Sequence, residues 1–262
     1  MNSVLKKVRM VSMLVTLGLV AALIIFICLL IRDVKEQKAA KEEYDELAGL
    51  ISIDEIDGEL PEGEDYPHFM IDMERYLVIN PDFVGILYVP MLDIRLPMVK
   101  AKDNSEYLNK TFEGQKNSSG CIFVDCESKE GFLDLNTFIY GHNMKNGTMF
   151  GNLKRFYREE GLCAADPRFY IFTKDKVFDY RIFGYEIVKP ESPLLQRIQK
   201  MPEYDPYVEE IRKESAYQNE EVDLTNRPPL VTLYTCYGSE HRDKFLVHGA
   251  LRKIFDLSER NR

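Results

Sequence analysis

The sequence of 262 residues predicts a mainly β domain with helices, placed behind an N-terminal transmembrane helix. Between residues 80 and 254, short apolar or alternating runs are separated by turn residues, as in β-barrels and β-sandwiches. Fifteen Tyr, fifteen Phe and no Trp fit the aromatic packing of a β-rich domain. Before these runs, residues 11–31 form one long apolar segment without a charge.

This apolar segment is long enough to cross a membrane. At about 1.5 Å of helical rise per residue, its 21 residues span a hydrocarbon core of roughly 30 Å. Lys6, Lys7 and Arg9 precede it, so the positive-inside rule predicts a cytoplasmic N-terminus at residues 1–10 and an exported remainder. A cleaved signal peptide is the alternative, but the segment is longer than a usual signal-peptide core and no A-x-A-like site follows. We expect an uncleaved signal anchor at residues 11–31.

Residues 32–66 are expected to connect the anchor with the folded domain. Their first part contains good helix formers and predicts a charged stalk or docking helix that ends near Gly49. Residues 51–66 contain seven acidic residues and no basic ones, which is typical of a solvated linker that sets the reach of the domain. A short amphipathic helix at 67–79 then leads into the domain, which we place at 67–258.

Two helices are expected to interrupt the strands of this domain. The segment 204–217 has Asp205 as a plausible N-cap, followed by Pro206 at the first helical position. The segment 147–161 predicts a helix that stops at its final glycine, with one face formed by Met149, Leu153, Phe156 and Tyr157. No internal repeat is visible, so we expect a single domain.

The charge and the cysteines exclude several classes of function. Asp and Glu outnumber Lys and Arg by 43 to 34, which argues against nucleic acid as the main partner. Cys28 lies in the predicted span, and the absence of a C-x-x-C pair argues against a zinc ribbon or a thioredoxin-type site. A Cys121–Cys126 disulfide stays open, although an odd separation in a strand points the two side chains to opposite faces. We expect Cys121, Cys126 and Cys163 to be small core or surface residues.

Cys236 and His142 are the candidates for nucleophilic catalysis. Each follows an apolar, strand-like run, and His142 lies in a turn rich in glycine and asparagine. A cysteine nucleophile needs a base or a cation to form the thiolate, and a donor for the oxyanion of the intermediate. Arg242 and Lys244 lie on one face of the next run because they are two residues apart, and a hairpin would bring either side chain near Cys236. By spacing alone, a structural role for Cys236 stays open.

The other histidines have simpler interpretations. His68 lies at the start of the helix predicted before the domain, and His248 lies inside the last strand, where we expect a structural role. His241 lies in the loop after Cys236. A metal site made of Cys236, His241 and His142 is a weak hypothesis, because no carboxylate or second cysteine follows at a useful spacing.

Two segments resemble motifs of the sortase family. Residues 136–156, NTFIYGHNMKNGTMFGNLKRF, resemble the segment around the catalytic histidine of this family, and VTLYTC at 231–236 resembles its T-L-x-T-C strand, which ends in the catalytic cysteine. NPDFVGILYVP, DNSEYL and SGCIFVD resemble the opening strands, and the helical insertion before the cysteine strand is a trait of class B. The resemblance runs from about residue 80 to residue 254. It implies a closed β-barrel of about eight strands with N-terminal helices and a helical insertion.

The resemblance implies roles for individual residues. Cys236 becomes the nucleophile that forms an acyl thioester, and His142 becomes the general acid and base. The family has an arginine where this chain has Lys244, and Arg242 lies two residues earlier on the same face. A lysine is a point charge without the bidentate fork of a guanidinium, so both residues are candidates for stabilising the oxyanion.

The resemblance also implies a substrate groove. Asn104 and Leu108 would line it by similarity, together with Thr235 of the cysteine strand. Tyr234 stands where class B members commonly have a small serine, and it points to the same face as Cys236, so it would reshape the groove.

The function implied is that of a membrane-anchored cysteine transpeptidase of a Gram-positive cell. Its partners would be secreted proteins with a C-terminal N-P-x-T-x type sorting signal, cleaved after Thr, and a cell-wall peptide amine that accepts the acyl group. No metal or organic cofactor is implied. A surface cysteine hydrolase with water as acceptor, and a non-catalytic binding module on the same fold, are the two alternatives.

Overall fold

The computed structural model describes residues 2–53, 65–238 and 242–257 of the chain. Its helices and strands are α1 (Asn2–Ala48), β1 (Ile51–Ile53), β2 (Phe69–Ile71), α2 (Met73–Ile79), β3 (Phe83–Val89), β4 (Ile94–Val99), β5 (Ile122–Val124), β6 (Asn136–Tyr140), α3 (Arg155–Arg158), α4 (Leu162–Ala165), β7 (Arg168–Phe172), β8 (Lys176–Val188), α5 (Tyr204–Glu214), β9 (Tyr217–Gln218), β10 (Leu230–Tyr237) and β11 (Asp243–Asp256). Short 3₁₀ turns lie at Pro90–Leu92 (η1), Glu106–Asn109 (η2), Pro193–Leu195 (η3) and Met201–Glu203 (η4).

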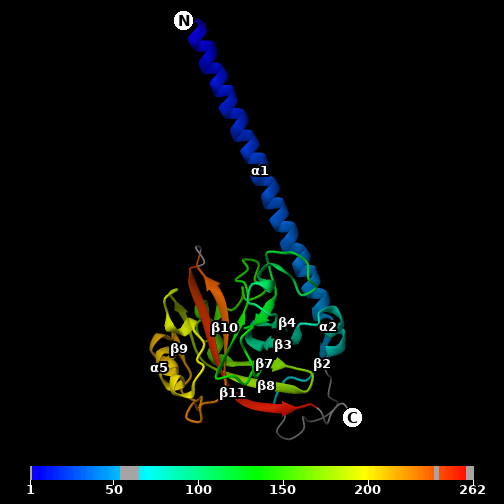
Figure 1. Cartoon of the computed structure of the whole chain (residues 1–262), viewed down its shortest axis with the longest axis vertical. Helices are drawn as coiled ribbons and strands as arrows, with labels where there is room; N and C mark the ends of the chain where they lie inside the picture. The colour runs from blue at the N-terminus through cyan, green and yellow to red at the C-terminus, as the bar shows by residue number, and fades with distance from the viewer. Residues whose placement is uncertain (1, 54–64, 239–241, 258–262) are drawn as a thin grey trace.

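Eight strands form a closed barrel (Figure 1). They follow one another in the order β11-β10-β6-β5-β4-β3-β7-β8, and pairing of β8 with β11 closes the ring. The short strand β9 adds to β8 outside the ring. Most pairs are antiparallel, but β4 pairs with β5 and β6 pairs with β10 in parallel. The predicted closed β-barrel of about eight strands is confirmed.

Alternation along the strands divides the apolar residues between two cores. Inside the barrel, Leu233 and Val247 join the large aromatic and aliphatic core, and both are fully buried. On the outer face, Leu230 and Leu246 pack with a second cluster that belongs to the insertion between β8 and β10. Helix α5 of this insertion supplies buried side chains to that cluster, so the outer faces of β10 and β11 are covered there.

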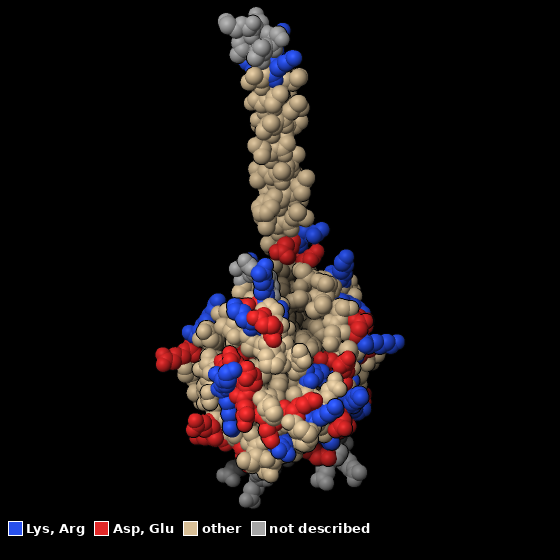
Figure 2. Space-filling view, turned by 60° about the vertical axis from the view of Figure 1, so that its left-hand side comes forward, with Lys and Arg blue, Asp and Glu red and all other residues tan. Residues whose placement is uncertain are grey.

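Helix α1 continues from its apolar part directly onto the barrel. Figure 2 shows a long part of the helix without charged side chains, and Figure 1 shows that this part extends away from the domain. The charged C-terminal part docks: the Tyr44 hydroxyl donates to the carbonyl of Gly120 at 3.0 Å, and the Asn117 amide donates to the carbonyl of Glu36 at 2.7 Å. By length and composition, α1 is a candidate membrane span.

The predictions for residues 51–79 are partly wrong. Ile51–Ile53 form a strand with Phe69–Ile71, so the predicted linker begins as β1, and residues 54–64 lie outside the described residues. The predicted helix at 67–79 is shorter, because β2 occupies its first part and the Asp72 side chain caps the helix by accepting from the Arg75 amide. His68 therefore precedes a strand. Pairing between β1 and β2 is a non-local contact, which the local pattern does not show.

The two helices predicted inside the domain also differ from the structure. The segment 147–161 contains only the short helix α3, because Gly147 and Met149 have positive φ angles of 83° and 52°, which interrupt a right-handed helix. Three of the four side chains predicted to share a face are buried, whereas Tyr157 is 47 % exposed. Helix α5 starts at Tyr204 rather than after Asp205, whose carboxylate binds Arg227 instead of capping the helix.

All five cysteines are free, so the disulfide between Cys121 and Cys126 that the sequence left open is not formed. Cys121 and Cys163 are buried, as expected for small core residues, and Cys126 is half-buried. Burial raises the pKa of the Cys121 and Cys163 thiols to about 12. Both thiols therefore stay protonated at neutral pH, and neither is a candidate nucleophile.

His248 has the structural role predicted for it. Its Nδ1 lies 2.8 Å from the Thr232 hydroxyl, its Nε2 lies 2.6 Å from the Glu186 carboxylate, and all three side chains are buried. The Ser215 hydroxyl donates to the second oxygen of Glu186 at 3.0 Å. This network joins β8, β10 and β11 with the residue that follows α5.

We predict that His248→Ala lowers the free energy of unfolding by about 3 kcal/mol, because it leaves the Glu186 carboxylate buried without its main partner. Urea-induced unfolding of the detergent-solubilised chain measures the change. Lys213→Ala, an exposed change on α5, is the control and should have little effect. A loss below about 1 kcal/mol in His248→Ala would contradict the prediction.

Candidate active site

The parallel pairing of β6 with β10 brings His142 and Cys236 to the same edge of the barrel. Tyr140 and Tyr234 are partners in this pairing. His142 and Cys236 each come two residues after these tyrosines, so both lie where the two parallel strands end. The sequence placed each residue at the end of a strand, but it did not show that the two strands are neighbours.

Lys244 is the cation that contacts the Cys236 thiol. Cys236 and Lys244 are partners in the antiparallel hairpin of β10 and β11, so their side chains lie on the same face. The Lys244 ammonium donates to the sulfur at 3.4 Å. The hairpin therefore places a cation in direct contact with the sulfur of Cys236.

Arg242 is placed differently from Lys244. It comes one residue before β11 begins, beyond the last strand pair Tyr237–Asp243, and its side chain is exposed. His241 lies outside the described residues. The hairpin predicted between the cysteine strand and the basic strand is present, and its register brings Lys244 rather than Arg242 opposite Cys236.

A loop under His142 holds the imidazole in place. Nε2 of His142 lies 2.7 Å from the carbonyl oxygen of Leu108, and because a carbonyl only accepts, this nitrogen carries the hydrogen. Gly120 packs beside the ring with a φ of 60°, and a Cβ there would lie 3.0 Å from the His142 ring and 2.8 Å from the Leu108 carbonyl. Tyr44 of α1 donates to the carbonyl of the same glycine, so α1 braces the loop that positions His142.

Asn143 and Thr235 tie the two strand ends together. The Asn143 amide donates to the carbonyl of Cys236 at 2.9 Å, and the Thr235 hydroxyl donates to the carbonyl of Gly141 at 2.7 Å. The Lys154 ammonium donates to Oδ1 of Asn143 at 3.1 Å, and because an ammonium only donates, this contact aims the NH₂ group at Cys236. Sequence reasoning missed Asn143 and Lys154. Only the position of Asn143, directly after His142, hinted at a role.

Tyr234 and Tyr140 form an aromatic surface beside Cys236. Their ring centroids lie 5.0 Å apart, and Tyr234 shares the outer face with Cys236 because the two residues are two apart. Burial raises the pKa of Tyr234 to about 12, and the neighbouring Cys236 adds to the rise. The phenol therefore stays neutral at physiological pH.

Asn104 and Leu108 lie on the same side of the barrel as the candidate site. The Leu108 side chain is 37 % exposed, and its carbonyl accepts from His142. The Asn104 side chain accepts from the backbone amide of Cys126 at 2.8 Å. Both residues come from the segment that precedes β5, as does Gly120.

Comparison with known proteins identifies the family of this chain. The family model described as the sortase domain matches residues 87–252, which include His142, Cys236 and Lys244. Sortase B of Listeria monocytogenes is 31% identical over 176 residues, which cover 66% of this chain and 71% of that protein. The chain is a class B sortase.

One further relative matches more of the chain, and a solved structure has a similar fold. Sortase B of Staphylococcus aureus is 24% identical over 249 residues, covering 92% of this sortase and 96% of that protein. The X-ray structure of Clostridium perfringens sortase B superimposes with a TM-score of 0.64 at 28% identity, covering 69% of this sortase and 99% of that chain. This sortase is therefore a cysteine transpeptidase of the family that anchors proteins to the cell wall and acts on substrates with sorting signals.

We predict that Lys244→Met slows the alkylation of Cys236 by iodoacetamide at neutral pH about tenfold, because the thiolate loses the ammonium at 3.4 Å. Arg242→Met is the matched comparison, since it removes a positive charge two residues away outside the strand. Mass spectrometry of the alkylated chain gives both rates. Slower alkylation in Arg242→Met than in Lys244→Met would assign the cation to Arg242 instead.

We predict that Asn143→Ala lowers kcat/KM for a sorting-signal peptide about tenfold. The variant loses the hydrogen bond between neutral groups that joins the two strand ends, which contributes roughly 1–1.5 kcal/mol. Lys145→Ala, an exposed change in the same loop, is the control. Steady-state peptide cleavage measures both variants. Equal kcat/KM in Asn143→Ala and the native chain would show that the tie does not position the site.

Proposed function

We propose that this sortase cleaves a C-terminal sorting signal of the N-P-x-T-x type after Thr, through a thioacyl intermediate on Cys236. One observation carries the proposal: the thiol of Cys236 lies 3.4 Å from the Lys244 ammonium, at the edge where β10 ends beside the strand that leads to His142. This arrangement combines a stabilised thiolate, a cation and an imidazole, the three components that thiol acyl transfer needs.

In the first half-reaction, the thiolate attacks the carbonyl carbon of the Thr–x bond, and the carbonyl electrons move to the oxygen. Lys244 stabilises this oxyanion, because the ammonium that contacts the sulfur also lies next to the carbon bound to it. The C–N bond then breaks, protonated His142 gives its proton to the departing amine, and the acyl group stays on Cys236 as a thioester. In the second half-reaction, His142 takes a proton from a cell-wall peptide amine, whose nitrogen attacks the thioester carbon. The C–S bond breaks and releases the thiolate of Cys236, which restores the thiolate and the protonated His142.

Lys244 stands where the family has an arginine, and this changes how the oxyanion is held. A guanidinium offers a planar fork, whereas the ammonium offers a point charge on a flexible stem. The hydrogen bonds from Asn143 and Thr235 keep the ends of β6 and β10, which carry the imidazole and the thiol, together. We keep Arg242 as the second candidate for the oxyanion, because the exposed loop end that carries it adjoins β11.

We also propose that α1 anchors the enzyme in the membrane through residues 11–31, with residues 1–10 in the cytoplasm and the catalytic domain at 67–258 outside the cell. Glu36 contacts the barrel only five residues after residue 31, so about 7–8 Å of helix separates the membrane from the domain. The docked helix, and not the acidic segment at 51–66, therefore sets the distance of the site from the membrane. Anchoring raises the effective concentration of exported substrates at the site.

The test uses the full chain in detergent and a peptide with an N-P-x-T-x signal, without any acceptor amine. We expect an intact mass that is increased by the peptide up to Thr, and no increase in Cys236→Ala. Addition of a glycine-based peptide amine should then convert the adduct into an amide product. Cleavage with water as acceptor in the presence of excess amine would favour the hydrolase alternative, and no adduct across a panel of such peptides would reject this class of signal.

A further inference from the structure

A cavity of about 880 Å³ lies between the loop that follows β5 and the insertion before β10. Its polar lining includes Glu127, Asp134 and Arg197, and its apolar lining includes Ile198 and Met201. Cavities of this size are large enough for several residues of a bound peptide. The mechanism proposed for Cys236 does not use it.

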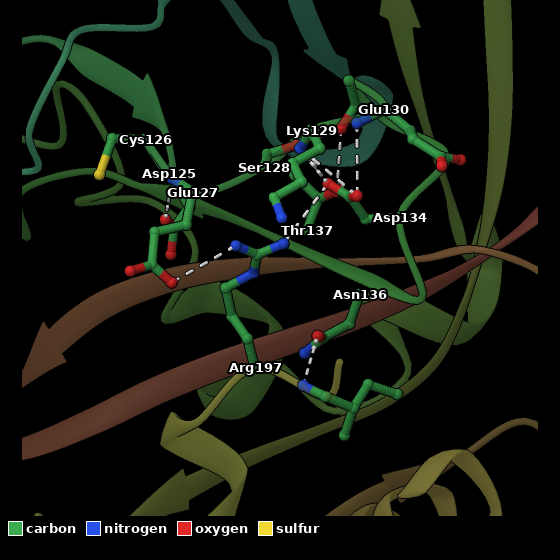
Figure 3. Close-up of polar contacts among 12 residues, drawn as sticks. Asp125, Cys126, Glu127, Ser128, Lys129, Glu130, Asp134, Asn136, Thr137 and Arg197 are labelled. Carbon is green, nitrogen blue, oxygen red and sulfur yellow. Dashed lines mark hydrogen bonds and ion pairs between the residues drawn. The ribbon is translucent and has the colours of Figure 1, made fainter. Parts of the chain in front are cut away.

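The loop at the rim of the cavity has a defined structure. Asp134 accepts from the backbone amides of Lys129 and Glu130, and the Ser128 hydroxyl donates to its carboxylate (Figure 3). The Thr137 hydroxyl donates to the carbonyl of Gly131 and fixes the loop to β6. The rim is therefore organised before any ligand arrives.

Arg197 reaches from the insertion into this region with unused hydrogen-bonding capacity. Its side chain is only 13% exposed, and its terminal nitrogens lie 3.7 Å from Glu127 and 3.5 Å from Asp134 (Figure 3). These ion pairs are longer than the 2.7–2.9 Å typical of charge-assisted hydrogen bonds. Nε of Arg197 is buried and has no hydrogen-bond partner in the part of the chain that the structure describes. Arg197 lines the cavity, and its terminal nitrogens, which make only long ion pairs, can donate to a ligand that brings acceptor oxygens.

Two chains of contacts connect the cavity with Cys236. Along the outer face of the barrel, Tyr234 packs on Tyr140, whose hydroxyl donates to Asp125 at 2.9 Å, directly before Cys126 of the cavity lining. Arg197 lies close enough to Tyr140 to oppose, by its charge, the rise in the pKa of that phenol that burial causes.

Along the neighbouring segment, Leu108 contacts His142 and Asn104 contacts Cys126. The cavity therefore continues the surface on which the substrate is proposed to lie.

The dimensions fit a peptide that runs from Cys236 into the cavity. Strand residues advance by roughly 3.3 Å, so the level of Tyr140 and Tyr234 is roughly 7 Å from Cys236 and the level of Pro229, which lines the cavity, is roughly 23 Å away. Four extended residues of an N-P-x-T signal cover about 13 Å. The residues that come before the signal therefore lie over the cavity.

We propose that this cavity is a further substrate subsite, which binds the stretch of the secreted protein immediately N-terminal to its sorting signal. The stretch lies extended, its backbone carbonyl oxygens accept from Arg197, and its apolar side chains contact Ile198 and Met201. The inference rests on the proposed function of Cys236, and it adds that recognition extends beyond the pentapeptide.

The test compares two peptides on the full chain in detergent: the acetylated signal N-P-Q-T-N, and the same signal preceded by S-L-S-L-S. We expect kcat/KM about tenfold higher for the longer peptide, because the terminal nitrogens of Arg197 gain hydrogen bonds to carbonyl oxygens. In Arg197→Gln this ratio should fall below about twofold. The ratio is measured within one enzyme, so it does not depend on the fraction of the variant that folds.

A second variant tests the cavity while Arg197 is kept. Met201 is 47% exposed, so Met201→Ser removes apolar contact in the cavity without disturbing the core, and it should lower the ratio two- to threefold. Met70→Ser, at an exposed methionine on β2, is the matched control and should keep the native ratio. Equal kcat/KM for the two peptides in the native chain overturns the subsite and leaves the proposed function standing. Cleavage of neither peptide overturns both.

Discussion

The parallel pairing of β6 with β10 is the contact on which the candidate site depends. In an antiparallel pair, the carboxyl end of one strand meets the amino end of the other, and His142 and Cys236 would lie at opposite edges. The parallel register sets Tyr140 beside Tyr234, so the two residues that follow each of them meet at one edge. The hydrogen bonds that the Asn143 and Thr235 side chains donate then hold these two strand ends together.

Two other parts of the fold support this edge. The hairpin of β10 and β11 supplies the cation, because its register places Lys244 directly opposite Cys236. Helix α1 supports the imidazole indirectly: Tyr44 holds Gly120, which packs under His142 in a conformation that a side chain would strain. Under the anchoring proposed above, the same helix would couple the position of the enzyme at the membrane to the geometry of its site.

Much of the fold and part of the site could be predicted from the sequence. Apolar alternation and turn residues predicted the β-rich domain, and the motifs around His142 and Cys236 predicted the family and the barrel of about eight strands. The helices at 67–79 and 147–161 were predicted too long, because a strand pair formed with β1 in one case and positive φ angles at Gly147 and Met149 interrupted the other. Local patterns show which residues are apolar, but they do not show which distant segment supplies a backbone partner.

Residue types and their spacing are enough to show that a cysteine and a histidine each follow an apolar run and that a long apolar segment precedes the domain. The position of Lys244, rather than Arg242, opposite the thiol follows from the folded chain, because hairpin register comes from pairing along the whole of β10 and β11. The long ion pairs of Arg197 with Glu127 and Asp134 also depend on the fold. These residues come from separate segments that meet only when the insertion folds onto the barrel.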